Sequence, residues 1–194
     1  MWFICAVSVG CLALLTERVY YIFFKFNTNA RQLMDAVQRN VIQNNIDGAV
    51  QVCNAARTSA VARVVKAGLG RADRSQLEIQ NAIEEATLEV VPEVTRFLPT
   101  LASLANIATL LGLLGTIIGL IDSFAALKNA APDDRQEKLS AGIAIAMNTT
   151  AFGLIVAIPT LLFHTILSVT AKNILDSIEL CSTKVGNLLS QRAK

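Results

Sequence analysis

Long apolar blocks alternate with stretches of mixed polarity along the chain. The blocks are Met1–Phe24, Leu101–Ile121 and Ala141–Val169. The second holds 21 residues without a charge, about 30 Å of helix, which matches one crossing of a bilayer core. The third is 29 residues long, enough to cross with tilt, and Pro159 within it predicts a kink. The pattern therefore predicts three transmembrane helices.

The stretch between the first two blocks, 25–98, has the periodicity of soluble helices. We expect breaks at 45–48 and 68–74, and a further helix from about Ser75 whose glutamates we interpret as a solvated face. The predicted buried stripe consists of Val37, Val41, Ile42, Val50, Cys53, Ala60, Val61, Val64 and Val65. The tail repeats this periodicity at Ile174, Ile178, Cys181, Val185 and Leu188.

These patterns predict an all-α integral membrane protein with a helical segment between its first two crossings. The six segments are a first transmembrane helix at 1–24, a cytosolic helical segment at 25–98, a second transmembrane helix at 99–125, a periplasmic loop at 126–140, a third transmembrane helix at 141–169 and a cytosolic C-terminal helix at 170–194. Lys and Arg number nine in the long segment, four in the tail and three in the loop. The raw count favours a cytosolic long segment and tail, although the short loop is denser in basic residues.

Composition and charge exclude several classes of function. The chain is 53% hydrophobic and 16% charged with a mean hydropathy of +0.49, which is too apolar for a disordered or ordinary soluble protein. A net charge of +2 disfavours a nucleic-acid partner. The four cysteines are far apart and the chain has one His, so we expect reduced packing cysteines, no disulfide framework and no metal site. No nucleophile, base and orienting residue form a recognisable set, so we expect no catalytic residues and no enzyme.

Projection at 100° per residue gives each of the last two crossings one face of small and polar residues. On the second crossing this face consists of Thr109, Gly112, Thr116, Gly119 and Ser123. On the third it consists of Gly142, Ala146, Thr149, Gly153, Ala157, Thr160 and His164, with Thr150 about 20° beyond its edge. Hydroxyl groups facing a shared interior bind water or donate to a carboxylate without burying a charge. For any single threonine, an equally good interpretation is that its hydroxyl only donates to a carbonyl of its own helix one turn back.

The remaining polar residues of the blocks are interpreted as interfacial. Asp122 ends the second crossing, and His164 lies toward the far end of the third, where it is an interfacial or packed residue. Glu17 and Arg18 are expected to anchor the first helix at the interface. Neither the second nor the third crossing contains a carboxylate in mid-membrane. A proton path would therefore take its titrating group from another polypeptide.

Two stretches, LASLANIATLLGLLGTIIGLIDSF and GIAIAMNTTAFGLIVAIP, resemble the paired signature of the MotA/TolQ/ExbB proton-channel family, and in particular its ExbB/TolQ branch. The resemblance implies a bacterial inner-membrane subunit with a periplasmic N-terminus and a cytosolic C-terminus. It implies a self-assembled ring, a pentamer, around the helices of an ExbD/TolR-like single-span partner whose membrane Asp titrates. It further implies protons as the coupling ion, no cofactor, and work on a TonB/TolA-like protein.

The resemblance also assigns roles to individual residues. Thr116 matches the pore threonine of the second crossing and Thr150 that of the third, with Thr149 as its neighbour. Together with the helical projection, this gives a predicted proton pathway of Thr116, Thr149, Thr150, Thr109 and Ser123, and predicted packing glycines Gly112, Gly119, Gly142 and Gly153. Ile145 stands where many members have a Glu, so no relay through a ring-borne acid is expected.

The expected function is that of a ring subunit in a proton-driven motor for energised transport or envelope work. Three alternatives are weighed against it. A non-conducting scaffold for partner helices would need no hydroxyl path. A flagellar-type stator has four crossings, whereas three are predicted here. A soluble enzyme would require the apolar blocks to be core helices.

Overall fold

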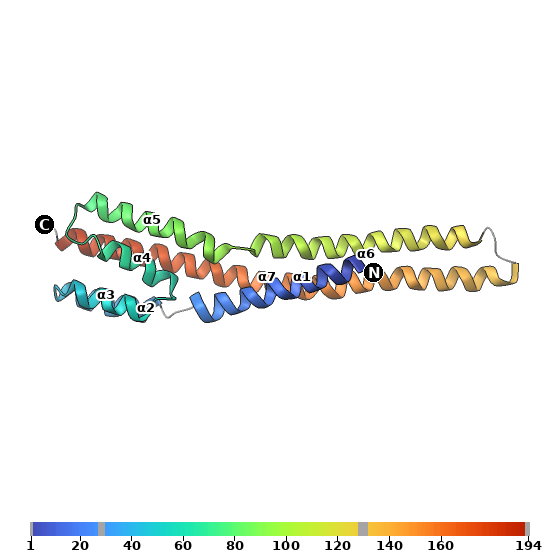
Figure 1. Cartoon of the computed structure of the whole chain (residues 1–194), viewed down its shortest axis with the longest axis horizontal. Helices are drawn as coiled ribbons and strands as arrows, with labels where there is room; N and C mark the ends of the chain where they lie inside the picture. Colours follow the sequence, from blue (N-terminus) through green and yellow to red (C-terminus); the bar gives the residue numbers. More distant parts are fainter. Residues whose placement is uncertain (1, 27–29, 128–131, 193–194) are drawn as a thin grey trace. The chain divides into compact units, whose positions relative to one another are not determined.

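The computed structural model describes residues 2–26, 30–127 and 132–192, and all its regular elements are helices (Figure 1). They are α1 (Trp2–Tyr20), the π-helical η1 (Tyr21–Phe26), α2 (Ala30–Ile42), α3 (Ile46–Ala55), α4 (Ala60–Leu69), α5 (Gln76–Thr95), α6 (Leu98–Leu127), the 3₁₀ turn η2 (Pro132–Asp134) and α7 (Arg135–Arg192). The described residues contain no strand, so the all-α prediction is confirmed for them.

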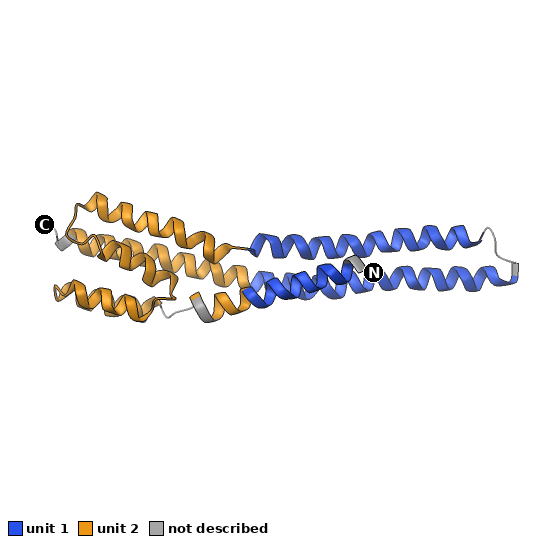
Figure 2. Cartoon of the chain, viewed as in Figure 1, with its two compact units in different colours: residues 1–17, 97–166 blue, residues 18–96, 167–194 orange. Residues whose placement is uncertain are grey.

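The chain divides into two compact units (Figure 2). Unit 1 comprises Met1–Glu17 and Phe97–Ile166. Unit 2 comprises Arg18–Arg96 and Leu167–Lys194. Unit 1 therefore holds most of α1, all of α6 and the first part of α7, whereas unit 2 holds α2 to α5 and the rest of α7.

Three helical stretches are long and apolar enough to cross a membrane, as predicted: Ile4–Phe23, Gln76–Leu127 and Arg135–Ser190. In the second stretch only 17% of the most apolar window is buried within the chain. Large apolar side chains instead point outward from α6 and α7, among them Leu110, Ile117, Ile121, Phe124, Met147, Ile155, Ile158 and Leu162. Such surfaces require lipid or another protein to cover them.

The helix ends of unit 1 differ in part from the predicted segments. α5 and α6 are separated at Arg96 and Phe97, where Phe97 has a left-handed φ of 62°. Pro99 falls in the first turn of α6, where no intrahelical donor is needed. The loop expected at 126–140 is helical at both its ends, and 128–131 lie outside the described residues. α7 is one helix that continues past Pro159 and across the expected boundary at 169–170.

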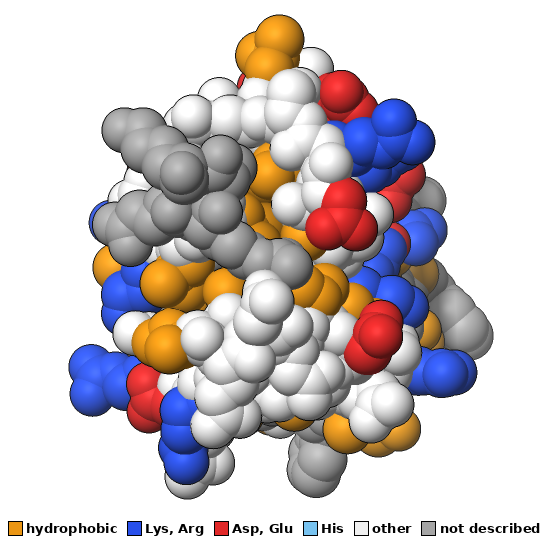
Figure 3. Space-filling model, turned by 90° about the vertical axis from the view of Figure 1, so that its left-hand side faces the viewer, with side chains coloured by type: hydrophobic (Ala, Val, Ile, Leu, Met, Phe, Trp, Pro, Cys, Tyr) orange, Lys and Arg blue, Asp and Glu red, His pale blue; other side chains and the backbone are white. Residues whose placement is uncertain are grey.

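Unit 2 buries most of the predicted apolar stripe. Val37, Cys53, Val61, Val64 and Val65 are buried, as are Ile174, Ile178, Cys181 and Val185 of α7. Ile42 was placed wrongly, because it is 69% exposed at the end of α2. Leu189 rather than Leu188 is the fully buried residue at the end of the tail stripe. On the face that Figure 3 views, charged side chains of both signs surround the exposed edges of hydrophobic residues.

Polar caps set the helix ends within unit 2. Ser75 accepts a hydrogen bond from the Glu78 amide at the start of α5, which confirms the predicted start. Ser59 caps α4 in the same way through the amide of Ala62. The start of α4 was not predicted from the sequence, because alanine and valine on both sides of Ser59 keep the helical periodicity. Asn44, with a φ of 62°, ends α2 in the left-handed conformation that asparagine tolerates.

Glu93 joins three elements of unit 2. Its backbone carbonyl accepts a hydrogen bond from Arg18 Nη1 at 3.3 Å, and its carboxylate receives both Nη atoms of Arg63, at 2.7 and 3.2 Å. The hydrogen bond from Glu93 raises the pKa of Arg63 above its usual value. Arg18 is only 2% exposed within the chain and its guanidinium lies 5.8 Å from the Tyr21 ring centroid, so it is packed against the protein. Its place at the membrane interface stays a prediction.

The ion pair also corrects the interpretation of Glu93 as part of a merely solvated face. The two side chains of this ion pair remain partly exposed, with an exposed fraction of 36% for Arg63 and 45% for Glu93. Water screens such a pair, so it contributes only about 0–1 kcal/mol to stability. Its value to the fold is therefore geometric, because it fixes α4 against the last turn of α5.

The thiol of Cys53 gives a direct test of the packing in unit 2. Burial raises the pKa of Cys53 to about 11, although the positive charge of Lys66 opposes the rise. We expect iodoacetamide at pH 8 to alkylate Cys53 at least about 100-fold more slowly in the folded protein than in urea, because the thiolate is the reactive form. Peptide mass spectrometry after timed quenching measures this rate.

The same shift makes a signed prediction for stability. The folded pKa lies above the unfolded one, so the stabilising effect of the neutral thiol is fully present below the unfolded pKa and is lost as the pH rises toward 11. Cys53→Ala serves as the control, since it should remove this pH dependence. Rapid alkylation of native Cys53 would contradict the buried position.

Candidate functional site

Glycines let the backbones of α6 and α7 touch inside unit 1. A Cβ atom placed on Gly112 would lie 3.2 Å from Thr150 Cα and 3.3 Å from Gly153 Cα. A Cβ atom on Gly153 would lie 2.8 Å from the carbonyl oxygen of Ala108. Both predicted packing positions are therefore occupied by glycine because a side chain has no room there.

Further pairs extend this contact in antiparallel order, and we call the whole contact the α6–α7 seam. A Cβ atom on Gly119 would lie 2.7 Å from Ala146 Cβ, and one on Gly142 would lie 2.8 Å from Ser123 Cβ. Gly115, which was not among the predicted packing glycines, faces Thr149 in the same way, with 2.7 Å to its Oγ1. Its place in the spacing Gly112, Gly115, Gly119 is the signal that would have included it.

Thr116 and Thr150 meet in the middle of the seam. Their hydroxyl groups are hydrogen bonded to each other. Thr150 Oγ1 also donates to the carbonyl oxygen of Gly112 across the two helices at 2.8 Å, and Thr116 Oγ1 lies 3.3 Å from the same oxygen. We call these two hydroxyls and the Gly112 carbonyl the threonine cluster. The structure thus brings together the two residues that the resemblance singled out, both half-buried.

Counting protons limits how these bonds are shared. Each hydroxyl has one proton and two lone pairs, and a carbonyl oxygen only accepts. Two protons serve three contacts, so one hydroxyl donates to Gly112 and the other donates the bond that joins the two hydroxyls. Both protons are then used inside the seam, while the oxygen atoms keep lone pairs that can accept a further hydrogen bond. The cluster at rest is therefore better prepared to receive a proton donor than an anion.

The other predicted pathway residues bond to their own helices. Thr149 donates to the Ala146 carbonyl at 2.6 Å, Thr109 to Ala105 at 3.3 Å, and Ser123 to Gly119 at 2.6 Å. Ser123 is also buried, against Gly142 of α7. For these three residues the structure shows a bond to a nearby carbonyl, which was the alternative interpretation of each hydroxyl. Their place in a proton pathway stays a prediction.

The titratable residues near the seam lie outside it. Asp122 is exposed and His164 is half-buried. Ile145, where the family resemblance led us to look for a carboxylate, is 65% exposed on the outer side of α7. Within the described residues, no group of three or more His, Cys, Asp or Glu side chains is placed to hold a metal ion. The chemistry available in the seam is consequently hydrogen bonding by hydroxyl and carbonyl groups.

Comparison with known proteins was decisive for the family. The model of the MotA/TolQ/ExbB proton channel family matches residues 56–180, which include α4, α5, α6 and the part of α7 that carries Thr150. This chain belongs to the MotA/TolQ/ExbB family. The resemblance found in the two apolar signatures is thereby confirmed, and the chain is a multi-pass membrane protein.

Individual MotA/TolQ/ExbB relatives carry ExbB names. An ExbB-like biopolymer transport protein of Synechocystis sp. is 30% identical over 157 residues, covering 80% of this chain and 74% of the relative. A biopolymer transport protein ExbB homolog of Methanothermobacter thermautotrophicus is 27% identical over 180 residues, covering 92% of this chain and 63% of the relative. The biopolymer transport protein exbB1 of Vibrio cholerae is 37% identical over 73 residues, covering 38% and 32%. These names place the chain in the ExbB branch of the family.

Proposed function

We propose that this chain is the ring subunit of an inner-membrane motor that couples proton flow to energised transport or envelope work. The observation that carries the proposal is the threonine cluster, two hydroxyl groups and a backbone carbonyl held together between two apolar helices of a proton channel family member. Hydroxyl and carbonyl groups can hydrogen bond to a proton-carrying acid in a low-dielectric region without the cost of burying a permanent charge. The family membership supports protons as the coupling ion, and the threonine cluster is the site that we propose for their transfer.

The titrating acid of the proposed motor comes from a second protein, an ExbD/TolR-like subunit with one span that contains an Asp. A protonated carboxyl group can donate to the free lone pairs of Thr116 or Thr150, whereas an ionised carboxylate needs a donor. Donating to a carboxylate obliges a threonine to give up its bond within the seam. The cluster at rest therefore favours the protonated acid, and each proton crossing 100 mV supplies about 2.3 kcal/mol for movement of the partner helix.

Assembly and orientation are further parts of the proposal. The apolar side chains that α6 and α7 turn outward give surfaces for neighbouring copies in a pentameric ring, for partner helices and for lipid. The excess of Lys and Arg in the long segment supports a cytosolic unit 2, with the N-terminus in the periplasm. A TonB/TolA-like protein would receive the movement.

One observation favours a different role, that of a non-conducting scaffold for partner helices. Both hydroxyl protons of the threonine cluster are already donated inside the chain, as they would be if Thr116 and Thr150 served helix packing alone. A scaffold would assemble the same ring and bind the same partner, but would conduct no protons.

Proton flux into proteoliposomes separates the two roles. The chain is reconstituted with and without an ExbD/TolR-like subunit from the same organism, and a pH-sensitive dye inside the vesicles reports flux under an imposed membrane potential. The motor predicts flux that requires both proteins and that disappears when the partner's membrane Asp is replaced by Asn. Stable assembly without flux would refute the motor and support the scaffold.

A further inference from the structure

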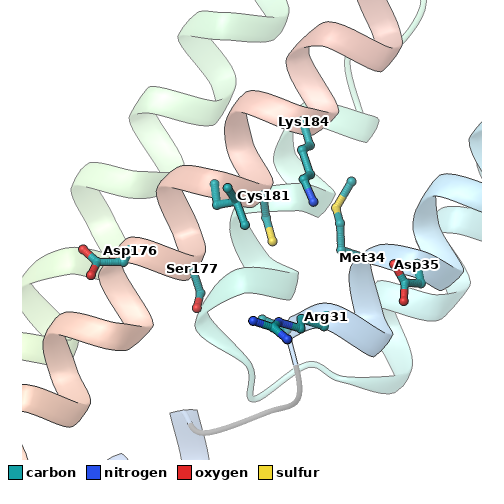
Figure 4. A pocket seen from close by; sticks show the side chains of 9 residues that line it. Arg31, Met34, Asp35, Asp176, Ser177, Cys181 and Lys184 are labelled. Atoms are coloured by element: carbon teal, nitrogen blue, oxygen red, sulfur yellow. The ribbon is translucent and has the colours of Figure 1, made fainter.

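A cavity of about 570 Å³ lies in unit 2, between α2 and the unit 2 part of α7 (Figure 4). It is separate from the threonine cluster, which belongs to unit 1. Its volume falls within the range of sites that hold small molecules in proteins. The side chains that decide its chemistry are Arg31, Met34 and Asp35 of α2, and Asp176, Ser177, Cys181 and Lys184 of α7.

The inner part of this cavity is uncharged. Met34 and Cys181 are each 3% exposed. Burial raises the pKa of the Cys181 thiol, although the nearby charge of Lys184 lowers it. The thiol is therefore protonated at neutral pH, and the two sulfur-bearing side chains form a small apolar floor.

Two cations from different helices face this floor. Figure 4 shows the guanidinium group of Arg31 and the ammonium group of Lys184 directed toward the space beside Cys181, while Asp35 and Asp176 lie at opposite edges. Among the described residues, neither Arg31 nor Lys184 forms an ion pair with a carboxylate. Both side chains are exposed, so water screens their charges from each other, and an anion between them can contact both. The hydroxyl group of Ser177, also on the cavity wall, adds a donor.

We propose that this cavity binds a small organic oxyanion, a molecule with a phosphate or carboxylate group attached to an apolar body. The oxyanion lies between Arg31 and Lys184, where the planar guanidinium forms paired hydrogen bonds and the ammonium acts as a point charge. The apolar body rests on Met34 and Cys181. This assignment is independent of the proposed motor function.

The two carboxylates of the lining distinguish this cavity from an ordinary basic patch. With two cations and two acids, the lining has no net charge, so long-range attraction of anions is weak and the arrangement of the groups must supply the affinity. Asp35 follows Arg31 by four residues on α2, the spacing at which helix side chains pair. It is therefore the natural competitor of a bound anion, and its removal should strengthen binding.

Calorimetric titration of the full chain in nanodiscs of zwitterionic lipid tests the site, with phenyl phosphate as the probe. We expect phenyl phosphate to bind more tightly than inorganic phosphate, and benzyl alcohol not to bind. Arg31→Gln and Lys184→Gln should each weaken phenyl phosphate about tenfold, the loss of one charge-assisted contact. Asp35→Asn should strengthen it. Arg71→Gln after α4 and Lys172→Gln on α7 are controls at exposed cations outside the lining and should change nothing.

Several results would overturn the proposal. They are the absence of phenyl phosphate binding, an equal loss in the two control variants, or weaker binding in Asp35→Asn. If inorganic phosphate bound as tightly as phenyl phosphate, Met34 and Cys181 would not contact the ligand, and this would contradict the proposed apolar part of the site. Because the readout is binding rather than proton flux, failure here leaves the motor proposal untouched, and failure of the motor leaves this site standing.

Discussion

Replacing Thr116 and Thr150 by Val should abolish proton-driven function while leaving the protein assembled. Valine has nearly the shape of threonine but lacks the hydroxyl, so the seam still closes. Hydrogen bonds between helices in membranes are worth only about 0.6 kcal/mol on average, so the cost in stability is small. A buried carboxyl group that loses its hydrogen-bond partner costs about 1–3 kcal/mol, so a transfer step that uses this partner should slow about tenfold or more per residue. Proton flux in proteoliposomes measures the loss, and size-exclusion chromatography measures the assembly.

The matched control is Thr165→Val on the same helix, because Thr165 is exposed and its hydroxyl donates to the Leu161 carbonyl one turn back. It should conduct like the unaltered protein. Thr150→Ser keeps the hydroxyl group and should therefore retain most of the proton flux of the unaltered protein. If the double valine variant conducts normally, the cluster serves packing alone and the proton path does not use these two hydroxyls.

A methyl group at Gly153 should loosen the α6–α7 seam. Its Cβ atom would lie 2.8 Å from a backbone oxygen of Ala108, which cannot rotate away as a side chain can. Overpacking of this kind costs about 1–3 kcal/mol. We expect Gly153→Ala to lower the melting temperature of the detergent-solubilised protein by several degrees, at about 2–4 °C per kcal/mol. Gly112→Ala should show a smaller effect, because its Cβ contacts begin at 3.2 Å.

Gly10→Ala provides the control for this series inside another span. A Cβ atom on Gly10 meets no atom within 4 Å, and alanine favours helix over glycine by up to about 1 kcal/mol. This variant should therefore match or exceed the stability of the unaltered protein. An equal drop in melting temperature for Gly10→Ala and Gly153→Ala would show that the seam is not the cause.

The apolar blocks were enough to predict the helices, because lipid-spanning length and the absence of charge are properties of the sequence itself. The projection also placed Gly112, Gly119 and Ser123 on the contact face of α6. It put Thr150 just beyond the edge of its face, although Thr150 lies in the centre of the seam and contacts Gly112. An ideal 100° step does not include the close approach that Gly112 allows, which brings Thr150 into contact from the edge of its face.

Other outcomes depended on partners that no local pattern contains. Arg18 and Glu93 are 75 positions apart, so their hydrogen bond was not visible in the sequence. The break before Ser59 could have been predicted, since Ser59 precedes an apolar run as a helix cap does. Gly48, interpreted as a break, lies inside the first turn of α3, where its amide donates to the capping Asn45. Glycine is needed there because a Cβ atom would come within 2.6 Å of Asn40 and Asn45 side-chain atoms.

One acceptor in the centre of the membrane helices is beyond the reach of ordinary mutagenesis. The oxygen that receives the Thr150 proton belongs to the main chain at Gly112, so a saturation library at this position changes bulk but never deletes that oxygen. Screens for loss of function will therefore show only the steric role of Gly112 and will not detect the role of its carbonyl oxygen as a hydrogen-bond acceptor. Incorporation of a hydroxy acid in place of Leu113 would turn the amide after Gly112 into an ester. The ester carbonyl is a weaker hydrogen-bond acceptor, so this change would measure what the Gly112 carbonyl contributes to the threonine cluster.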